Sequence, residues 1–127
     1  MEKMNVKPAT GKLGVLCVGL GAVTSTFMTG VLMARKGLAK PVGSMTQYDK
    51  MRVGRGENKK YLHYGEIVPL ANLNDIVFGA WDVYPANAYE SAVNAEVLKE
   101  KDINPVKDEL EKIVPMKAAF DHNYASR

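Results

Sequence analysis

Residues 13–26, LGVLCVGLGAVTST, contain the feature that most limits how this chain can fold. Aliphatic and β-branched residues dominate positions 13–18, and a Gly-Leu-Gly turn at 19–21 separates them from a run typical of a helix. We therefore predict a buried strand over Leu13–Val18, a glycine turn, and a helix that begins at Ala22. This arrangement directs the backbone N–H groups of a helix N-terminus toward a phosphate group, as in dinucleotide-binding α/β folds.

The same stretch lies in an uncharged run from Leu13 to Ala34, which is long enough to cross a bilayer. Four glycines and four hydroxyl residues lower the hydropathy of the run, and no aromatic belt flanks it. A signal peptide is also disfavoured, because the run is longer than a usual apolar region and no small-X-small cleavage site ends it. A strand followed by a helix is the preferred interpretation, and a single membrane span is the alternative.

The charge is unevenly distributed. The formal net charge of +3 is too small to indicate a nucleic-acid partner, but residues 1–48 hold six basic side chains and one acidic side chain. This basic part suits a phosphate ligand and equally suits a solvated basic rim. Cys17 is the only cysteine, so no internal disulfide can form, and we expect it to be a small core residue.

The first helix is predicted over Ala22–Lys36, where Gly37 is a good residue to end it. Its expected apolar face is Val23, Phe27, Val31 and Ala34. Residues 41–65 are rich in glycine and basic side chains, and we expect two short strands there, near Met51–Val53 and Tyr61–His63.

A second buried strand is predicted at Asp75–Trp81. A helix is expected to follow Pro85, from about Ala86 to Lys99, with Tyr89, Val93 and Val97 on one face. A further helix is expected after Asn104-Pro105, an N-cap and a first-turn proline, and to end before Pro115. Met116–Phe120 is the expected last strand. This order of strands and helices predicts an α/β fold with a parallel sheet.

The dinucleotide fingerprint is incomplete. Thr24 stands where the third glycine normally allows the helix to pack on the strand. The acid that normally follows about 20 residues later, to bind the adenosine ribose, is missing. Asp49 or Asp82 could replace it, or the ribose could be held without a carboxylate. His63 and His122 lack the spacing of metal ligands, so we expect no metal site, and no catalytic motif is found.

Five segments in order resemble one known family. They are Gly19–Thr26, Gly43–Gln47, Asp75–Val83, Asn87–Ala92 and Val114–Lys117. Together these segments resemble the myo-inositol-1-phosphate synthase (inositol-3-phosphate synthase) family. In that family a similar glycine loop binds the cofactor, and a similar Gly-Gly-Trp-Asp-Ile segment ends a strand.

The resemblance implies a partial Rossmann-like, doubly wound parallel sheet with flanking helices, and NAD as cofactor. By motif position the cofactor-binding residues would be Gly19, Leu20, Gly21, Ala22, Val23, Thr24 and Asp82. Asp82 would then be the missing carboxylate. Two positions depart from the family: Ala80 replaces a glycine, and Ala22-Val23 stand where many eukaryotic members have Gly-Asn.

The resemblance also implies an activity: conversion of D-glucose 6-phosphate to 1D-myo-inositol 3-phosphate by NAD-dependent oxidation, cyclisation and reduction. Family members are longer and act as cytoplasmic homotetramers without nucleic acid or membrane. We therefore expect residues 1–11 to be an arm and 12–127 to be the first part of the NAD-binding domain, without catalytic residues and inactive alone. The alternative is a non-catalytic half-Rossmann module that binds a nucleotide or a partner.

Overall fold

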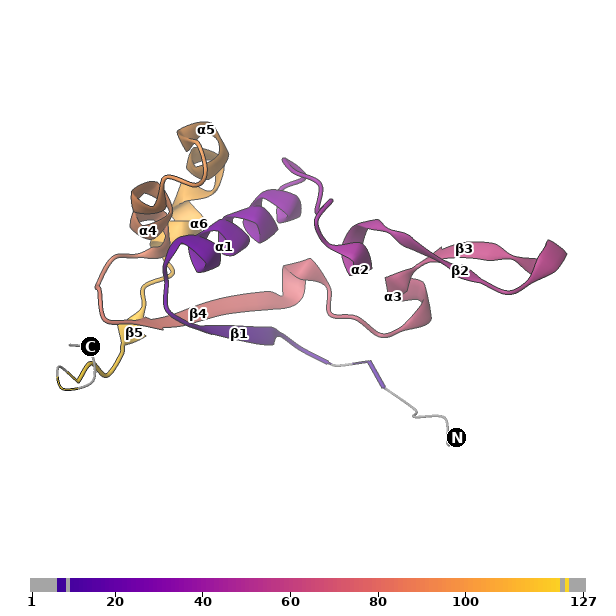
Figure 1. The fold of residues 1–127 in the computed structure, drawn as a ribbon, viewed down its shortest axis with the longest axis horizontal. Coiled ribbons are helices and arrows are strands. Elements are labelled where there is room, and N and C mark those ends of the chain that lie inside the picture. Colours follow the sequence, from indigo (N-terminus) through magenta and orange to yellow (C-terminus); the bar gives the residue numbers. More distant parts are fainter. Residues whose placement is uncertain (1–6, 9, 122, 124–127) are drawn as a thin grey trace.

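The computed structural model describes residues 7–8, 10–121 and 123. Its main sheet has three parallel strands in the order β1-β4-β5, formed by Leu13–Val18, Ile76–Asp82 and Met116–Lys117. The helices that pack on this sheet lie on one of its faces (Figure 1). The predicted α/β fold, a partial Rossmann-like parallel sheet with flanking helices, is confirmed. Its carboxyl strand ends lie at one edge, where such folds bind ligands.

Strand β1 is an edge strand of this sheet. It pairs with β4 in a register that runs from Leu13 opposite Ile76 to Val18 opposite Trp81. Val18 is 90% exposed and Leu16 is 60% exposed, whereas Cys17 is half-buried and packs against the core. The prediction of a fully buried first strand is therefore wrong, because the described residues cover only the helix-facing side of the sheet.

Helix α1 spans Ala22–Arg35 and ends as the sequence predicts. Gly37 adopts a left-handed conformation with φ of +68°, which favours glycine. The Gly37 N–H donates to the Ala34 carbonyl and the Leu38 N–H donates to the Met33 carbonyl, both at 3.0 Å. These two bonds form a Schellman motif, which satisfies carbonyl groups that the helix end leaves without partners.

Helix α4 spans Ala88–Ala95 and is shorter than the predicted helix over Ala86–Lys99. Asn87 is its N-cap: the Asn87 side chain accepts from the Glu90 N–H, and the Glu90 carboxylate accepts from the Asn87 N–H, both at 2.9 Å. This capping box fixes the start of the helix. Glu96 ends it in the left-handed region, with φ of +53°.

The region after α4 contains two short helices. They are α5, Glu100–Ile103, and α6, Lys107–Glu111, joined by a 3-10 turn over Asn104–Val106. The prediction that Asn104 caps a helix is wrong, because the Asn104 side chain instead accepts from the Tyr89 hydroxyl at 3.2 Å. Strand β5 is also shorter than predicted, since it pairs with β4 only at Trp81 and Asp82.

The core lies between the sheet and the helices α1, α4, α5 and α6. Its buried hydrophobic residues are Leu20, Met28, Leu32, Ala80, Ala88, Ala92, Ile103, Val106 and Leu110. From α1 the core also receives the buried hydroxyl residues Ser25 and Thr29. The apolar face predicted for α1 is wrong, because Val23 is 84% exposed and Phe27 is 41% exposed. Val93 and Val97, which belong to the face predicted for the next helix, are also exposed. The contact between α4 and the core is made instead by the small residues of α4.

The segment between α1 and β4 forms a separate unit. It contains α2 (Met45–Tyr48), β2 (Lys50–Val53), β3 (Lys60–His63) and α3 (Tyr64–Ile67), together with 3-10 turns at Gly56–Asn58 and Leu73–Asp75. Strands β2 and β3 pair antiparallel in their own two-stranded sheet, as the sequence predicts. The hairpin projects away from the main sheet (Figure 1).

Arg35, the last residue of α1, joins the two ends of this segment. Its Nε–H donates to the Leu73 carbonyl at 2.7 Å, and its Nη2 donates to the Ile76 carbonyl. The guanidinium also lies 5.5 Å from the centroid of the Phe78 ring. The chain therefore leaves the sheet layer after α1 and returns to it at the same point.

Residues 7–8 and 10–11 of the predicted N-terminal arm are exposed and lie outside helices and strands, and the rest of the arm lies outside the described residues. Within the part of the chain that the structure describes, we find no helix with the length and hydropathy needed to cross a membrane. The uncharged run from Leu13 to Ala34 is divided between β1 and α1.

Candidate functional site

The turn between β1 and α1 presents backbone N–H groups at the carboxyl edge of the sheet. Gly19 has a φ of +95°, and its N–H donates to the Trp81 carbonyl at 2.7 Å. Gly21 is the N-cap of α1, no side chain caps this helix, and no acidic residue lies in its first turn. The first N–H groups of a helix have no partners within it, so those of α1 can donate to an anion.

Gly21 differs from Gly19 in its backbone conformation. Its φ of −89° and ψ of −158° are accessible to any residue. Among the described residues, a Cβ atom built on Gly21 would meet no heavy atom within 4 Å. Neither backbone strain nor a clash with this part of the chain explains a glycine here. The open space beside its backbone is instead suited to a group that approaches the N–H groups closely, as a pyrophosphate does.

Asp82, the last residue of β4, faces this turn. Its Oδ2 atom accepts from the Leu20 N–H at 2.5 Å, and its Oδ1 atom accepts from the Tyr84 N–H at 3.0 Å. The hydrogen bond from Tyr84, followed by the one from Leu20, lowers the pKa of the Asp82 carboxyl below its ordinary value. Asp82 is therefore a carboxylate at neutral pH and holds the glycine turn against the end of β4.

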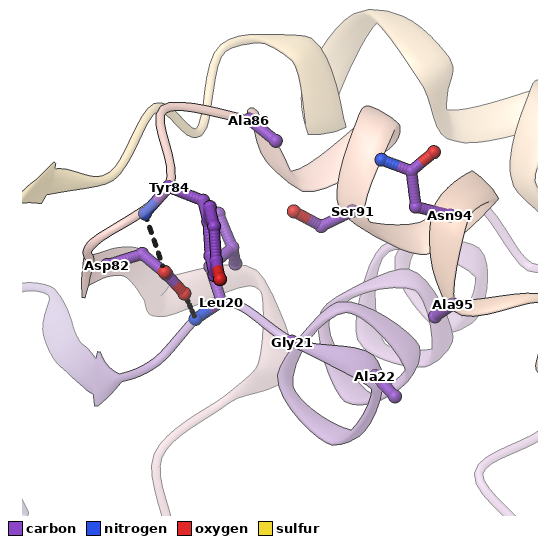
Figure 2. A pocket seen from close by; sticks show the side chains of 9 residues that line it. All are labelled: Leu20, Gly21, Ala22, Asp82, Tyr84, Ala86, Ser91, Asn94 and Ala95. Carbon is purple, nitrogen blue, oxygen red and sulfur yellow. Dashed lines mark hydrogen bonds between the residues drawn. The ribbon is translucent and has the colours of Figure 1, made fainter. Parts of the chain in front are cut away.

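A cavity of about 250 Å³ lies over the turn. Figure 2 shows the residues that line it: Leu20, Gly21, Ala22, Asp82, Tyr84, Ala86, Ser91, Asn94 and Ala95. They come from the β1–α1 turn and the start of α1, from the end of β4 and the segment after it, and from α4. Tyr84, Ser91 and Asn94 were not predicted from the sequence, although the capping box at Asn87 and Glu90 signals that a helix begins beside this edge.

The topology explains why an acid at about 20 residues is missing. In dinucleotide-binding folds the ribose-binding acid ends the strand that follows the first helix and lies beside the first strand. Here β4 is that neighbour of β1, and the segment from 37 to 75 is inserted before it. Asp82 therefore ends the strand beside β1, although it lies far along the chain from Gly21.

The other predicted residues take different places. Gly19 shapes the turn, Leu20 is buried, and Ala22 lines the cavity. The Val23 side chain lines a different cavity with Phe27 and Val97. Thr24 is half-buried and is not among the described residues that line the cavity over the turn.

The alternatives for ribose and metal binding lie elsewhere. Asp49, the other candidate acid, is exposed and directly precedes the hairpin, away from the cavity over the turn. His63 ends β3 in that hairpin, and His122 lies outside the described residues. Among the side chains that the structure describes, no three potential ligands gather as a metal site would require.

The fold and the site together define a dinucleotide-binding α/β domain of the Rossmann-like class. Residues 13–127 match an NAD-binding family model described as myo-inositol-1-phosphate synthase. The chain therefore belongs to the myo-inositol-1-phosphate synthase family, and the family model identifies NAD as its cofactor.

Individual relatives agree with this assignment. The chain is 61% identical over 126 residues to inositol-3-phosphate synthase 1 of Bacteroides thetaiotaomicron. The matched region covers 98% of this chain and 29% of the relative. It is 33% identical to inositol-3-phosphate synthase isozyme 1 of Arabidopsis thaliana, over 89% of this chain and 24% of that protein. The chain thus spans about a quarter to three tenths of the length of these relatives.

A solved structure shows the same fold. The crystal structure of inositol-3-phosphate synthase from Caenorhabditis elegans superposes with a TM-score of 0.74 at 27% sequence identity. The match covers 91% of this chain and 25% of that chain. The β1–α1–β4 arrangement described above is therefore shared with a synthase of known structure.

Proposed function

We propose that this chain is the NAD-binding portion of an inositol-3-phosphate synthase, which converts D-glucose 6-phosphate to 1D-myo-inositol 3-phosphate by oxidation, cyclisation and reduction. The observation that carries the proposal is the open space at Gly21, beside the uncapped N-terminus of α1 and opposite the Asp82 carboxylate. Bound NAD⁺ would supply a hydride acceptor for the oxidation of a sugar hydroxyl.

The residues of the turn have distinct roles in this proposal. The backbone of Gly19, Leu20 and Gly21 shapes the approach to the pyrophosphate, and the N–H groups of Ala22, Val23 and Thr24 donate toward it. The positive end of the 14-residue α1 adds to this attraction. Each of these contacts uses the backbone, so the proposal tolerates the side chains of Ala22, Val23 and Thr24 pointing elsewhere.

Asp82 binds the adenosine ribose in this proposal. Each oxygen of its carboxylate accepts one backbone N–H and retains a further lone pair for a ribose hydroxyl. The two backbone bonds fix the orientation of the carboxylate before a ligand arrives. The donor set therefore fits an NAD⁺ molecule whose pyrophosphate lies on the glycine turn and whose ribose lies against the end of β4.

The remainder of the synthase is the proposed partner of residues 12–127. Val18 and Val77 are exposed on the face of the main sheet that carries no helix, and Val77 is 52% exposed. Apolar sheet faces are normally covered in α/β domains, so this face suits a further layer of the same enzyme. Residues 1–11 would remain an arm, and the whole enzyme would be a cytoplasmic homotetramer, as the family resemblance implies.

Calorimetric titration tests the proposal. In this experiment NAD⁺ is titrated into the full-length protein that the gene encodes. We expect saturable binding to the natural sequence and a loss of at least about tenfold in affinity for Gly21→Leu, because the new side chain fills the space of the pyrophosphate. The backbone at Gly21 accepts a leucine, so the free energy of unfolding should change by no more than about 1 kcal/mol.

Gly30→Ala is the matched control. Gly30 lies inside α1, and a Cβ atom there meets no heavy atom of the described residues within 4 Å. This change should stabilise the helix by about 0.5–1 kcal/mol and leave NAD⁺ affinity unaltered. Equal NAD⁺ affinity in the natural protein and in Gly21→Leu would contradict the proposed site.

A further inference from the structure

Two polar side chains of α4, those of Ser91 and Asn94, line the cavity over the glycine turn (Figure 2). Residues three apart in a helix lie on the same face, so both side chains belong to one wall of this cavity. Gly21 and Ala22, at the start of α1, line the cavity as well. The cavity is therefore bounded by the uncapped N-terminus of α1 and by the two polar side chains of α4.

These two side chains are not tied to the rest of the chain. Within the part of the chain that the structure describes, we find no hydrogen bond of the Ser91 hydroxyl or of the Asn94 amide. The first polar residues of α4 differ, because the side chains of Asn87 and Glu90 form the capping box. A hydroxyl and a primary amide both carry hydrogen-bond donors. The donors of Ser91 and Asn94 are therefore available to a ligand in the cavity.

The described residues that line the cavity include no cation that could pair with a pyrophosphate. Asp82 is the only charged residue among them. The N-terminus of α1 attracts an anion, but its N–H groups reach a pyrophosphate from one side only. Phosphate oxygens that leave water need hydrogen bonds on their other sides as well. The neutral hydroxyl and amide of α4 are suited to donate these bonds.

We propose that Ser91 and Asn94 bind the pyrophosphate of the dinucleotide from the α4 side of the cavity, while the glycine turn and the start of α1 bind it from the other side. This inference rests on the proposed function, because it requires the pyrophosphate to lie on the turn. It adds two side chains that the dinucleotide fingerprint does not include, since in that fingerprint the glycine loop and the first helix alone meet the pyrophosphate.

Calorimetric titration of NAD⁺ into variants of the full-length protein tests this inference. Asn94→Leu removes the amide at similar size and should weaken NAD⁺ binding about tenfold, because a hydrogen bond to a charged group is lost. Asn94→Asp should weaken it by about thirtyfold, because the new carboxylate keeps the shape of the side chain but repels the pyrophosphate. Ser91→Ala should weaken NAD⁺ binding about threefold.

The order of these affinities separates a contact with the pyrophosphate from other roles of Asn94. A carboxylate accepts hydrogen bonds from ribose hydroxyls, so Asn94→Asp would bind NAD⁺ at least as tightly as the natural protein if this side chain faced a ribose. A side chain that only fills space could likewise be replaced by aspartate without loss. Full NAD⁺ affinity in Asn94→Asp, or equal losses in Asn94→Leu and Asn94→Asp, would overturn the inference.

Asn58→Asp is the matched control, since it makes the same chemical change at an exposed residue in the turn of the β2–β3 hairpin, which does not line this cavity. It should leave NAD⁺ affinity unchanged. Asn94 is exposed, so its variants should fold as the natural protein does. Unaltered NAD⁺ affinity in both Asn94 variants would overturn this inference and leave the proposed function standing. Failure of the natural protein to bind NAD⁺ would overturn both together.

Discussion

At the scale of single residues, Asp82 is the group that joins the two halves of the site. Its carboxylate accepts backbone N–H groups from Leu20 and from Tyr84, which both line the cavity over the turn. A charged acceptor makes stronger hydrogen bonds than a neutral one. The position of the glycine turn therefore depends on the ionisation of one side chain.

This dependence predicts how stability changes with pH. Because the pKa of Asp82 is lower in the folded chain than its ordinary value of 3.8, its carboxylate stabilises the fold above that value and ceases to do so as pH falls through the folded pKa. We expect Asp82→Asn to lower the melting temperature at pH 7. The difference from the natural protein should narrow as the pH is lowered below about 4.

Thermal unfolding followed by circular dichroism between pH 7 and pH 2.5 measures this effect. Asp49→Asn is the control, since Asp49 is exposed and lies beside the hairpin. The difference in melting temperature between Asp49→Asn and the natural protein should not narrow in this way as the pH falls. A difference between Asp82→Asn and the natural protein that stays constant with pH would show that the carboxylate charge does not hold the turn.

The glycine turn of the candidate site could be predicted from the sequence. The other residues of the site could not be predicted from spacing alone, because the fold brings them together from distant parts of the chain. The glycine turn at 19–21 was recognisable because Gly19 needs its positive φ and precedes a helix. Asp82 and Asp49 were both candidate acids, and only the family resemblance selected Asp82, since the usual spacing rule assumes that the next strand follows the first helix directly. Tyr84 belongs to the site because the segment after β4 passes beside the turn, and Ser91 and Asn94 belong to it because α4 lies beside the same cavity.

At the scale of secondary structure, the contact between α1 and α4 depends on small side chains. Ser25 and Thr29 from α1, and Ala88 and Ala92 from α4, are all buried. The Thr29 hydroxyl donates to the Ser25 carbonyl at 2.8 Å, which allows a polar side chain to be buried within the helix contact. Both helices also border the cavity over the turn, so their separation controls its width.

Enlarging one of these small residues should separate the helices. We expect Ala92→Leu to reduce the free energy of unfolding by about 1–3 kcal/mol, because the close contact leaves no room for extra methylene groups. Urea denaturation measures the change. Val93→Leu is the matched control, since Val93 is the next residue and is 39% exposed, and it should cost less than about 0.5 kcal/mol. An equal cost for both changes would contradict this account of the packing.

The bounds of α1 followed from its sequence, but its buried face did not. Gly37 and the preceding basic residues marked its end correctly. The stripe that includes Val23 and Phe27 is more apolar than the face that is buried, which includes Ser25 and Thr29. Hydropathy counts hydroxyl groups as polar, whereas these two can bond to carbonyl groups of their own helix.

At the scale of the whole molecule, the chain has one covered and one uncovered side. The helices and the cavities of the proposed cofactor site lie on one face of the main sheet, whereas Leu16, Val18 and Val77 expose apolar surface on the other. The described residues therefore offer a place for a dinucleotide. In the proposed function, the sugar chemistry belongs to the length of the relatives that this chain does not span.

We accordingly expect residues 1–127 alone to show no turnover of D-glucose 6-phosphate, measured as release of inositol phosphate. The Bacteroides thetaiotaomicron synthase is 61% identical to this chain over the matched residues. Co-expression with the remaining segment of that synthase should restore turnover. The same mixture carrying Gly21→Leu should remain inactive. Turnover by residues 1–127 in the absence of any added segment would show that a catalytic centre lies within them.

The contact of Arg35 with the carbonyls of Leu73 and Ile76 has an evolutionary consequence. The Arg35 guanidinium ties the end of α1 to the start of β4, and the entropy cost of closing the segment between them grows only slowly with its length. Hairpins could be gained, lost or exchanged there without moving Gly19 relative to Asp82. What selection must preserve is the adjacency of two strand ends in space, and the count of residues between them is free to drift.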